Sequence, residues 1–295
     1  MKASAKTQIN PLALWIEASR PKTLLISVCP VLLGNVIAWQ AGSFSWIIFL
    51  MTLLTSMGIQ ITTNFANDYF DFIKGADTTD RKGPRRVTQS GLVTINEIKK
   101  AVIWTAVITA ILGSYLTYIG GPLIGLMLSA SILIGIGYTG GPFPLAYLGL
   151  GEIFVILFFG IAATQGSYYL QLGNVRYEAT WLGISYGLVP AAVLVVNNLR
   201  DIEEDWRSHK KTLCVRFGET FGRIEYTAFL VLACVIPCFV GCYFQLLTLL
   251  PAVAPLKAIW KNQSDRRALN VPFVQTAKLV LLYTLLLCAS WIWWL

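Results

Sequence analysis

The sequence predicts an all-α, polytopic membrane protein with about nine transmembrane helices around a central cavity that is open to the cytoplasmic side. Composition is the first observation: the 295 residues are 56% hydrophobic and only 13% charged, whereas a soluble domain carries about a quarter charged residues. The second observation is that apolar runs of roughly 20 residues recur along most of the chain, which is the length a helix needs to cross a bilayer. The third is that almost all basic residues fall in alternate loops. We therefore expect residues 1–295 to form a single transmembrane domain.

The elements can be placed in order from their hydropathy. A polar arm, 1–22, has an interfacial character around Trp15 and lacks the short apolar core of a cleaved signal peptide. Apolar runs predict the membrane spans 23–40, 46–71, 98–119, 122–139, 150–170, 179–199, 225–243, 245–260 and 277–295. The string Gly120-Gly-Pro122 predicts a tight turn between the third and fourth spans. Polar loops at 72–97 and 200–223 follow the second and sixth spans.

The distribution of basic residues predicts the orientation of the chain. With these spans, 22 of the 23 Lys and Arg residues lie on one side of the membrane, and only Arg176 lies on the other. Because cytoplasmic loops carry the excess of Lys and Arg, we expect the N-terminus to face the cytoplasm and the C-terminus to lie outside. This bias accounts for the net charge of +8, so the sequence gives no reason to expect nucleic acid as a partner. We expect the inner membrane of a bacterium as the location, and the sequence identifies no protein partner.

Two clusters of Asn and Asp residues follow the second and sixth apolar runs. In the first, Asn64, Asn67, Asp68 and Asp71 recur at helical spacing and face one way. In the second, three residues repeat at intervals of four positions, namely Asn197, Asp201 and Asp205. Carboxylates at a membrane helix end are costly without a function, so we interpret the pair as one site that faces the cytoplasm.

The residue types in these clusters favour a hard divalent cation. Carboxylate and amide oxygens suit Mg²⁺, which commonly uses one or two protein carboxylates and leaves positions for phosphate and water. Several cations surround the clusters: Lys74, Arg81, Arg85, Arg86, Arg200, Lys210 and Lys211. The predicted ligand is a diphosphate bridged by Mg²⁺ between the two helices. Apolar and aromatic walls beneath it predict that the rest of the ligand is a hydrocarbon.

Other functions remain open from the residues alone. Each acidic cluster by itself could pair with neighbouring Lys and Arg on a solvated face. A transporter of a phosphorylated lipid or divalent ion would place its polar site near the bilayer midplane, whereas the acidic residues here collect at one face. A scaffold subunit would need neither Asp68 nor Asp201.

The motifs resemble those of the UbiA superfamily of intramembrane aromatic prenyltransferases. The superfamily resemblance rests on Asn67-Asp-x-x-Asp71 and Asp201-x-x-x-Asp205. Further strings resemble the branch that acts on 1,4-dihydroxy-2-naphthoate in menaquinone biosynthesis: Lys74-Gly-Ala-Asp77, Gly83-Pro-Arg85, Gln89-Ser-Gly91, Gly140-Gly-Pro-Phe-Pro144, Gly166-Ser-Tyr-Tyr-Leu-Gln171, Asn197-Asn-Leu-Arg-Asp201 and Lys211-Thr-Leu-x-Val-Arg-Phe-Gly218. The last three predicted spans resemble the superfamily only in their apolar character, without a matching motif. Where relatives commonly have a glycine, this chain has Ser208-His-Lys210, which bears on the conformation of that loop.

The resemblance implies a reaction and a role for each matching residue. It implies Mg²⁺-dependent transfer of a prenyl group from a polyprenyl diphosphate to dihydroxynaphthoate, with loss of CO₂ and formation of demethylmenaquinol. The implied metal ligands and catalytic residues are Asn67, Asp68, Asp71, Asp201 and Asp205. Implied substrate contacts are Asn64, Lys74, Asp77, Arg85, Asn197, Arg200 and Lys211. The loops 72–97 and 200–223 would lie over this active site. A sister enzyme with another aromatic acceptor is the nearest alternative.

Aromatic side chains are candidates for stabilising an allylic cation, because their faces are electron-rich. The candidates near the clusters are Tyr69, Phe72, Tyr138, Phe143, Tyr168 and Tyr169, of which Tyr138 and Tyr168 are the predicted substrate contacts. Packing at the membrane interface is the alternative role for each. Glu152, at the start of the fifth span, is interpreted either as an acceptor contact or as a residue that caps or anchors the helix.

Overall fold

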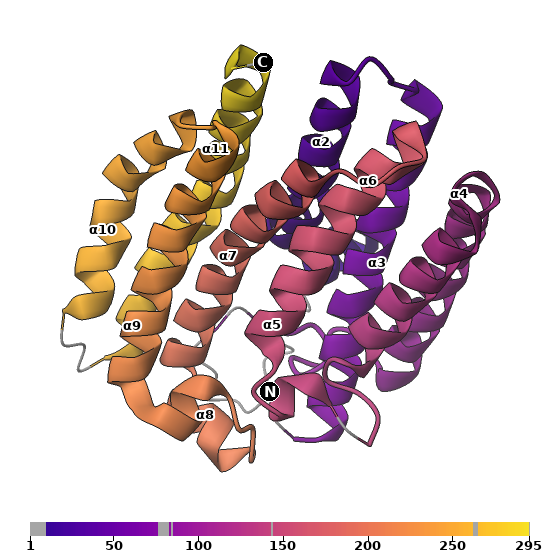
Figure 1. Cartoon of the computed structure of the whole chain (residues 1–295). Helices are drawn as coiled ribbons and strands as arrows, with labels where there is room; N and C mark the ends of the chain where they lie inside the picture. The colour runs from indigo at the N-terminus through magenta and orange to yellow at the C-terminus, as the bar shows by residue number, and fades with distance from the viewer. Residues whose placement is uncertain (1–9, 76–82, 84, 143, 262–264, 295) are drawn as a thin grey trace, which may run out of the picture.

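The computed structural model describes residues 10–75, 83, 85–142, 144–261 and 265–294. Over these residues the chain forms helices and no strands (Figure 1). Seven helical segments are long and apolar enough to cross a membrane: Pro21–Gln40, Trp46–Ile73, Ile95–Gly137, Gly151–Leu172, Tyr177–Arg200, Leu213–Val240 and Arg266–Trp293. A shorter apolar segment spans Phe244–Trp260. The predicted all-α, multi-span fold is confirmed, and the count of nine crossings stays a prediction.

Two helices lead into the first acidic cluster. The short helix α1 (Pro11–Ser19) begins at Asn10, whose side chain caps the Leu12 N–H at 3.0 Å. It packs on the bundle through Trp15, whose ring lies edge-on to Phe65 at 5.7 Å. Helix α2 (Pro21–Gln40) follows directly, and helix α3 (Trp46–Ile73) then runs back toward α1. The first acidic cluster therefore lies in the last turns of α3.

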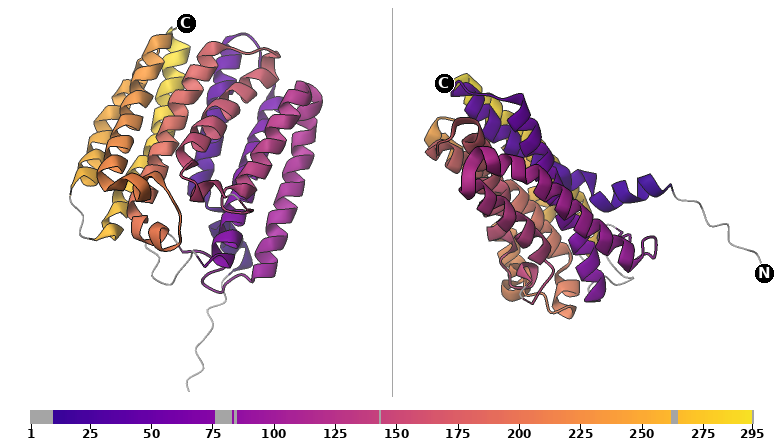
Figure 2. Two further views of the ribbon diagram at one scale, coloured as in Figure 1. Left: turned by 60° about the horizontal axis from the view of Figure 1, so that its bottom comes forward. Right: turned by 90° about the vertical axis from the view of Figure 1, so that its right-hand side faces the viewer.

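Helix α4 (Ile95–Gly137) is a hairpin of two helical arms. Gly121 has φ 75° and ψ −173° between the arms, a backbone conformation that glycine adopts readily. The predicted turn at Gly120-Gly-Pro122 is therefore observed, and it lies at the end of the molecule opposite α8 (Figure 1). Only 6% of the apolar window of α4 is buried, against 78% for α7 (Tyr177–Arg200). Helix α4 thus lies at one edge of the bundle and α7 inside it (Figure 2).

The fifth span changes its helical form part-way along. It consists of α5 (Gly151–Val155), the π-helical segment η2 (Ile156–Ala162) and α6 (Ala163–Leu172). At Gly160 the backbone of η2 meets α7 so closely that a Cβ there would lie 2.5 Å from the Gly183 carbonyl oxygen. Small residues allow such contact between membrane helices, and π-helical turns are frequent at functional sites.

The C-terminal part begins with more helix than the sequence predicts. Within 200–223 the chain forms α8 (Ile202–Arg207) and the start of α9 (Leu213–Val235). Thr212 caps α9, and Gly218 breaks it with φ 84°, so the helix begins well before the predicted position 225. The remaining elements are η3 (Ile236–Val240), η4 (Phe244–Thr248), α10 (Leu249–Trp260), η5 (Arg266–Leu269) and α11 (Asn270–Trp294).

The arrangement brings both acidic clusters to one end of the bundle. The C-terminal end of α7, the start of α5, and α8 lie together at the lower end in Figure 1, whereas α11 ends at the opposite end. The main core is built from α2, α7, α9 and α11, and it includes Leu33, Tyr186, Tyr226 and Trp291. The three-residue helix η1 (Leu145–Tyr147) lies between α4 and α5 in the chain.

Candidate active site

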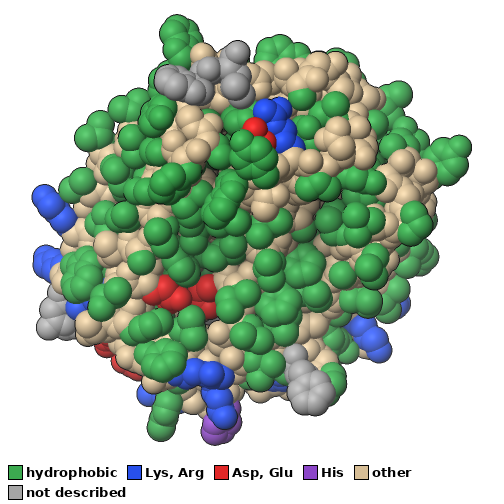
Figure 3. Space-filling model, viewed as in Figure 1, with side chains coloured by type: hydrophobic (Ala, Val, Ile, Leu, Met, Phe, Trp, Pro, Cys, Tyr) green, Lys and Arg blue, Asp and Glu red, His purple; other side chains and the backbone are tan. Residues whose placement is uncertain are grey.

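One cavity of about 360 Å³ joins the two acidic clusters to the interior of the bundle. Residues from α2, α3, α4, the fifth span, α7 and α8 line it, together with Phe273 of α11. Its polar end contains Asn67, Asp71, Asn197, Asp201, Glu204 and Asp205. Its deeper part reaches Leu116, Met127 and Leu170. Asp and Glu side chains are visible in a hollow of the lower half of the molecule, with Lys and Arg along the lower edge (Figure 3).

The first cluster divides between the cavity and the surrounding structure. Asn67 and Asp71 line the cavity, and the Asn67 amide oxygen accepts a hydrogen bond from the Thr139 hydroxyl at 2.9 Å. Asn64 also lines it, but its amide nitrogen donates to the Ser19 carbonyl at 2.9 Å and the Thr23 hydroxyl at 3.0 Å. Asn64 thereby ties α3 to the junction between α1 and α2.

Asp68 lies outside the cavity wall. It is 3% exposed and lies beside Val87, Thr88 and the charge of Arg20. One of its carboxylate oxygens is buried without a hydrogen-bond partner among the described residues. Of the four residues predicted to share one helix face, Asp68 is thus the one turned toward the neighbouring loop.

Asp71 has two cationic partners. Arg86 donates to one carboxylate oxygen at 2.8 Å, and Lys210 lies 3.5 Å from the other. Lys210 follows α8, so this ion pair joins the first acidic cluster to the loop after the second. The predicted meeting of the two distant clusters is therefore found at Asp71, Lys210 and Asp205, all of which line the cavity.

The second cluster is organised by Arg200. Its guanidinium is fully buried and donates to both carboxylate oxygens of Asp201, at 2.6 and 2.7 Å. The same group donates to the amide oxygens of Asn197 at 2.7 Å and Asn270 at 2.9 Å. This bidentate geometry fixes the Asp201 side chain at the cavity wall, while Arg200 itself lies outside the lining residues.

Asp205 lies in α8 and carries a perturbed pKa. Burial raises the pKa of its carboxyl to about 7, opposed by the charge of Lys210 and reinforced by Asp201, Asp71 and Glu204. Near neutral pH a cation binding to this carboxylate would compete with a proton.

The cations that line the cavity differ from the predicted substrate contacts, although Arg86 and Lys210 were among the cations expected around the clusters. The lining residues include Arg20, Arg86 and Lys210. The predicted contacts Lys74, Arg85, Arg200 and Lys211 are not among them. Lys74 donates to the Thr139 carbonyl at 2.6 Å, and exposed Arg85 pairs with Glu17 at 2.8 Å. Asp77 and Phe143 lie outside the described residues.

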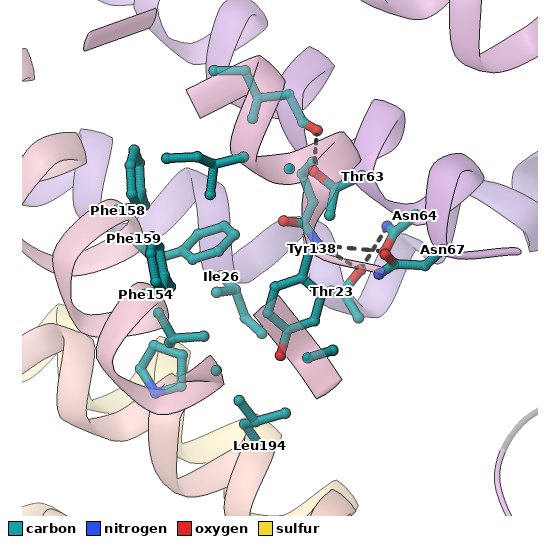
Figure 4. Close-up of a pocket in the computed structure, with 18 of the residues that line it drawn as sticks. Thr23, Ile26, Thr63, Asn64, Asn67, Tyr138, Phe154, Phe158, Phe159 and Leu194 are labelled. Carbon is teal, nitrogen blue, oxygen red and sulfur yellow. Dashed lines mark hydrogen bonds between the residues drawn. The ribbon is translucent and has the colours of Figure 1, made fainter. Parts of the chain in front are cut away.

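The aromatic side chains that line the cavity, called the aromatic wall below, also differ from the prediction. Tyr138 lines the cavity, whereas Tyr168 is packed in the main core. Phe154, Phe158 and Phe159, which were not predicted, lie opposite Tyr138, Asn64 and Asn67 (Figure 4). The rings of Phe154 and Phe158 stack with centroids 5.9 Å apart and an interplanar angle of 7°. Their spacing of four positions in the fifth span was the available signal.

A further acidic side chain faces the cavity one turn from the second cluster. Glu152 is 2% exposed, and its carboxylate accepts a hydrogen bond from the Asn198 amide at 2.8 Å. Both residues line the cavity. The Tyr138 hydroxyl lies close to the same turn: a Cβ atom added to Gly151, the residue before Glu152, would lie 2.7 Å from the hydroxyl oxygen.

The oxygen atoms at the polar end fit a hard divalent cation held together with a ligand. Among the described residues, no three His, Cys, Asp or Glu side chains form a ready-made metal cluster. Asp71 and Asp201 instead face the cavity from opposite helices, next to the amides of Asn67 and Asn197. Mg²⁺ usually takes one or two carboxylates and completes its shell with phosphate and water, so this donor set suits it when a phosphate is present.

Comparison with known proteins identifies the family. A model of the UbiA prenyltransferase family matches residues 27–282. The chain belongs to the UbiA prenyltransferase family. The expected resemblance is therefore confirmed for most of the chain. It extends beyond the motifs into the last three spans, which the sequence analysis matched only in character.

Two bacterial relatives of this UbiA-family chain bear the same name. A 1,4-dihydroxy-2-naphthoate octaprenyltransferase of Escherichia coli (strain K12) is 38% identical over 230 residues, which cover 76% of this chain and 75% of that protein. A protein of that name from Haemophilus influenzae is 36% identical over 238 residues, which cover 78% of this chain and 77% of that one.

Solved structures show the same UbiA fold. The apo structure of a UbiA homolog from Aeropyrum pernix K1 superposes with a TM-score of 0.67 at 16% identity, covering 91% of this chain and 96% of that one. A UbiA homolog from Archaeoglobus fulgidus bound to DMAPP and Mg²⁺ gives a TM-score of 0.61 at 13% identity, covering 93% and 99%.

Proposed function

We propose that this UbiA-family protein transfers a polyprenyl group from an isoprenoid diphosphate to 1,4-dihydroxy-2-naphthoate, releasing CO₂ and giving demethylmenaquinol. The names of the bacterial relatives support this choice of acceptor. The observation that carries the proposal is one continuous cavity, in which an oxygen-rich end with cations continues into an aromatic and apolar interior. A diphosphate with a long hydrocarbon tail and a flat aromatic acceptor match these two halves.

The proposed location is the inner membrane of a bacterium, with the N-terminus and the polar end of the cavity on the cytoplasmic side and the C-terminus outside. On the face shown in Figure 3, most of the described Lys and Arg side chains lie toward the end that carries α8, which supports this orientation because cytoplasmic loops carry the excess of Lys and Arg.

The polar end would hold Mg²⁺ and the diphosphate. In the proposal Asn67, Asp71, Asp201 and Asp205 hold the cation, and Asn64 and Asn197 assist. Asp68, a ligand predicted from the sequence, lies outside the cavity wall. Bound there, Mg²⁺ would neutralise the diphosphate and stabilise the charge that develops on it as it leaves. Because Arg20, Arg86 and Lys210 line the cavity, they are better placed for phosphate contacts than Lys74, Arg85, Arg200 and Lys211.

The chain's own residues would then manage the allylic cation and the acceptor. The faces of Tyr138, Phe154 and Phe158 border the cavity below the polar end, where they exclude water and stabilise positive charge. The ring carbon that carries the acceptor carboxylate bonds to the allylic carbon. The carbon–carboxylate bond then breaks and its electron pair restores the aromatic ring, so no strong general base is required.

The test uses purified protein in detergent with 1,4-dihydroxy-2-naphthoate, polyprenyl diphosphates of several lengths and Mg²⁺. We expect a prenylated, decarboxylated product by mass spectrometry, which disappears with EDTA and with Asp201→Ala. A matched control is Asp265→Asn, at the exposed cap of η5 and outside the cavity lining. Preference for 4-hydroxybenzoate would instead indicate a sister acceptor, and product formed without any divalent metal would contradict the mechanism.

A further inference from the structure

Glu152 and Glu204 are the cavity-lining carboxylates that the proposed chemistry has not used, and of these two Glu152 is the buried one. It lies almost completely buried in the first turn of the fifth span, and Asn198 holds one of its oxygens at 2.8 Å. Asp71 and Asp201 each bind an arginine. Among the ion pairs of the described residues, by contrast, none involves Glu152.

A buried carboxylate needs donors to offset its desolvation. The Asn198 amide supplies one, and the open cavity beside Glu152 leaves room for another from a bound molecule. Asn198 precedes Asp201 by three positions in α7, so by helical rise it lies roughly 4.5 Å deeper along the helix than Asp201.

The residues around Glu152 indicate what kind of bound molecule would supply this hydrogen-bond donor. Phe154 and Phe158 present stacked rings two and six positions further along the same span, and the Tyr138 hydroxyl lies over the turn that holds Glu152. Flat aromatic molecules pack well against such rings. The described cations that line the cavity belong to the polar end, which leaves Glu152 suited to a neutral hydroxyl donor rather than an anion.

We propose that Glu152, oriented by Asn198, accepts a hydrogen bond from a ring hydroxyl of the aromatic acceptor. This contact, which rests on the proposed function, selects a hydroxylated ring and raises the electron density of the ring carbon that attacks. The proton stays in the O–H···O bond, and Glu152 forms no covalent bond. Glu152 is thereby a specificity-determining residue, and Asn198 is a positioning residue.

A purely structural role for Glu152 makes a different prediction. An acidic residue in the first turn of a helix interacts favourably with the helix dipole. If this were its whole role, replacing it would lower the thermal stability and would leave the discrimination between acceptors unchanged.

The experiment measures acceptor kinetics for the full-length protein in detergent, with prenyl diphosphate and Mg²⁺ saturating. Glu152→Gln keeps the shape but removes the charge and replaces one acceptor oxygen with a donor NH₂ group, and Glu152→Asp keeps the carboxylate. Asn198→Ala removes the orienting amide. The matched control is Glu178→Gln, which changes an acid at the start of the next span, paired with Arg176 at the opposite end of α7. Each variant is also titrated with 1-hydroxy-2-naphthoate and 4-hydroxy-2-naphthoate as competitive inhibitors.

We expect Glu152→Gln to lower kcat/KM for the acceptor roughly 10- to 100-fold, the usual effect of losing a hydrogen bond to a charged group. The KM for prenyl diphosphate should stay within about twofold. In the wild type the two monohydroxy inhibitors should differ in Ki, and in Glu152→Gln this difference should shrink. Glu152→Asp should recover part of the activity, and Glu178→Gln should behave as wild type.

Two results would overturn the inference while leaving the proposed function intact. One is an active wild type whose Glu152→Gln variant keeps its acceptor kinetics. The other is a variant in which the Ki ratio of the two inhibitors is unchanged. If Glu152→Gln does not fold, Asn198→Ala tests the inference in its place. We expect it to lower kcat/KM for the acceptor by a smaller factor. A wild type that prenylates no naphthoate would instead refute the proposed function.

Discussion

Arg86 and Asp71 form a buried ion pair with a 2.8 Å contact between the guanidinium and the carboxylate. Arg86 comes from the loop between α3 and α4, and Asp71 from the last turn of α3, so the pair fixes the loop over the polar end of the cavity. The neighbouring Arg85 points away and pairs with Glu17, where both side chains are about half exposed. The two adjacent arginines thus bind different helices: Arg86 pairs with α3 at the cavity, and Arg85 pairs with α1 at the surface.

This contrast predicts different costs for the same substitution. Arg86→Met removes the partner of a buried carboxylate, which typically costs about 3–5 kcal/mol, less what Lys210 compensates. Arg85→Met breaks an exposed pair worth about 0–1 kcal/mol. Thermal unfolding in detergent with EDTA should therefore show a clear loss for Arg86→Met only. Added Mg²⁺ should restore part of it, because the cation replaces the lost positive charge. Equal unfolding temperatures for the two variants would refute this assignment.

Helical periodicity explains why much of the site could be predicted. Residues three and four positions apart share a helix face, and the prediction placed Asn67 and Asp71 together as the structure has them. At 100° per residue, Asp68 lies about 60° around α3 from Asp71. That offset is enough to turn it from the cavity toward Val87 and Thr88. The sequence pattern predicts which residues share a face of α3, but the packing around that face decides which of their side chains reach the cavity.

Loops and neighbouring helices account for what the sequence did not predict. Loop residues follow no helical period. Whether Arg85 or Arg86, and Lys210 or Lys211, lines the cavity therefore depends on tertiary contacts. Arg200 was predicted to contact the diphosphate, whereas its guanidinium binds Asp201 and Asn197, its neighbours in the chain, and Asn270. The contact to Asn270 depends on the packing of α11 against α7. Two of the three cavity-lining phenylalanines of the fifth span, Phe158 and Phe159, lie in the π-helical segment η2, which was not predicted from the sequence.

Arg200 supplies a second test. Arg200→Lys keeps the charge but cannot hold both Asp201 oxygens and two amides, so we expect a loss of about 1–3 kcal/mol. Because Arg200 lies outside the cavity lining, kcat should fall while the KM for prenyl diphosphate stays within about twofold. Steady-state kinetics and thermal unfolding measure both effects, with exposed Arg207→Lys as the control. A tenfold rise in that KM without loss of stability would instead make Arg200 a diphosphate ligand.

The pKa of Asp205 predicts a pH dependence of metal binding. Burial raises this pKa to about 7, so the carboxyl is largely protonated below pH 7 and ionised above it. Because Mg²⁺ binds the carboxylate form, its apparent affinity should rise as pH increases through 7, by at most about tenfold per unit when one proton is displaced. Calorimetric titration of EDTA-stripped protein at pH 6, 7 and 8 measures it. Asp205→Asn should flatten the profile, and a wild-type affinity independent of pH would contradict the prediction.

The contact between η2 and α7 supplies a test that links packing to chemistry. A Cβ on Gly187 would lie 2.9 Å from the Ile156 Cα and 3.1 Å from the Gly160 Cα, which are backbone atoms that cannot rotate away. Gly187→Ala should therefore force η2 outward and destabilise the protein by about 1–3 kcal/mol. Since Phe158 and Phe159 belong to η2 and line the cavity, kcat should fall as well.

Gly137→Ala is the matched control for that substitution, because a Cβ at Gly137 would have no neighbour within 4 Å. Near the end of α4, alanine there should leave stability unchanged or raise it by up to about 1 kcal/mol. Thermal unfolding and turnover of both variants decide the matter. If Gly187→Ala loses stability but keeps full turnover, the aromatic wall does not depend on the position of η2, and the role of Phe158 beside the reacting atoms has to be abandoned.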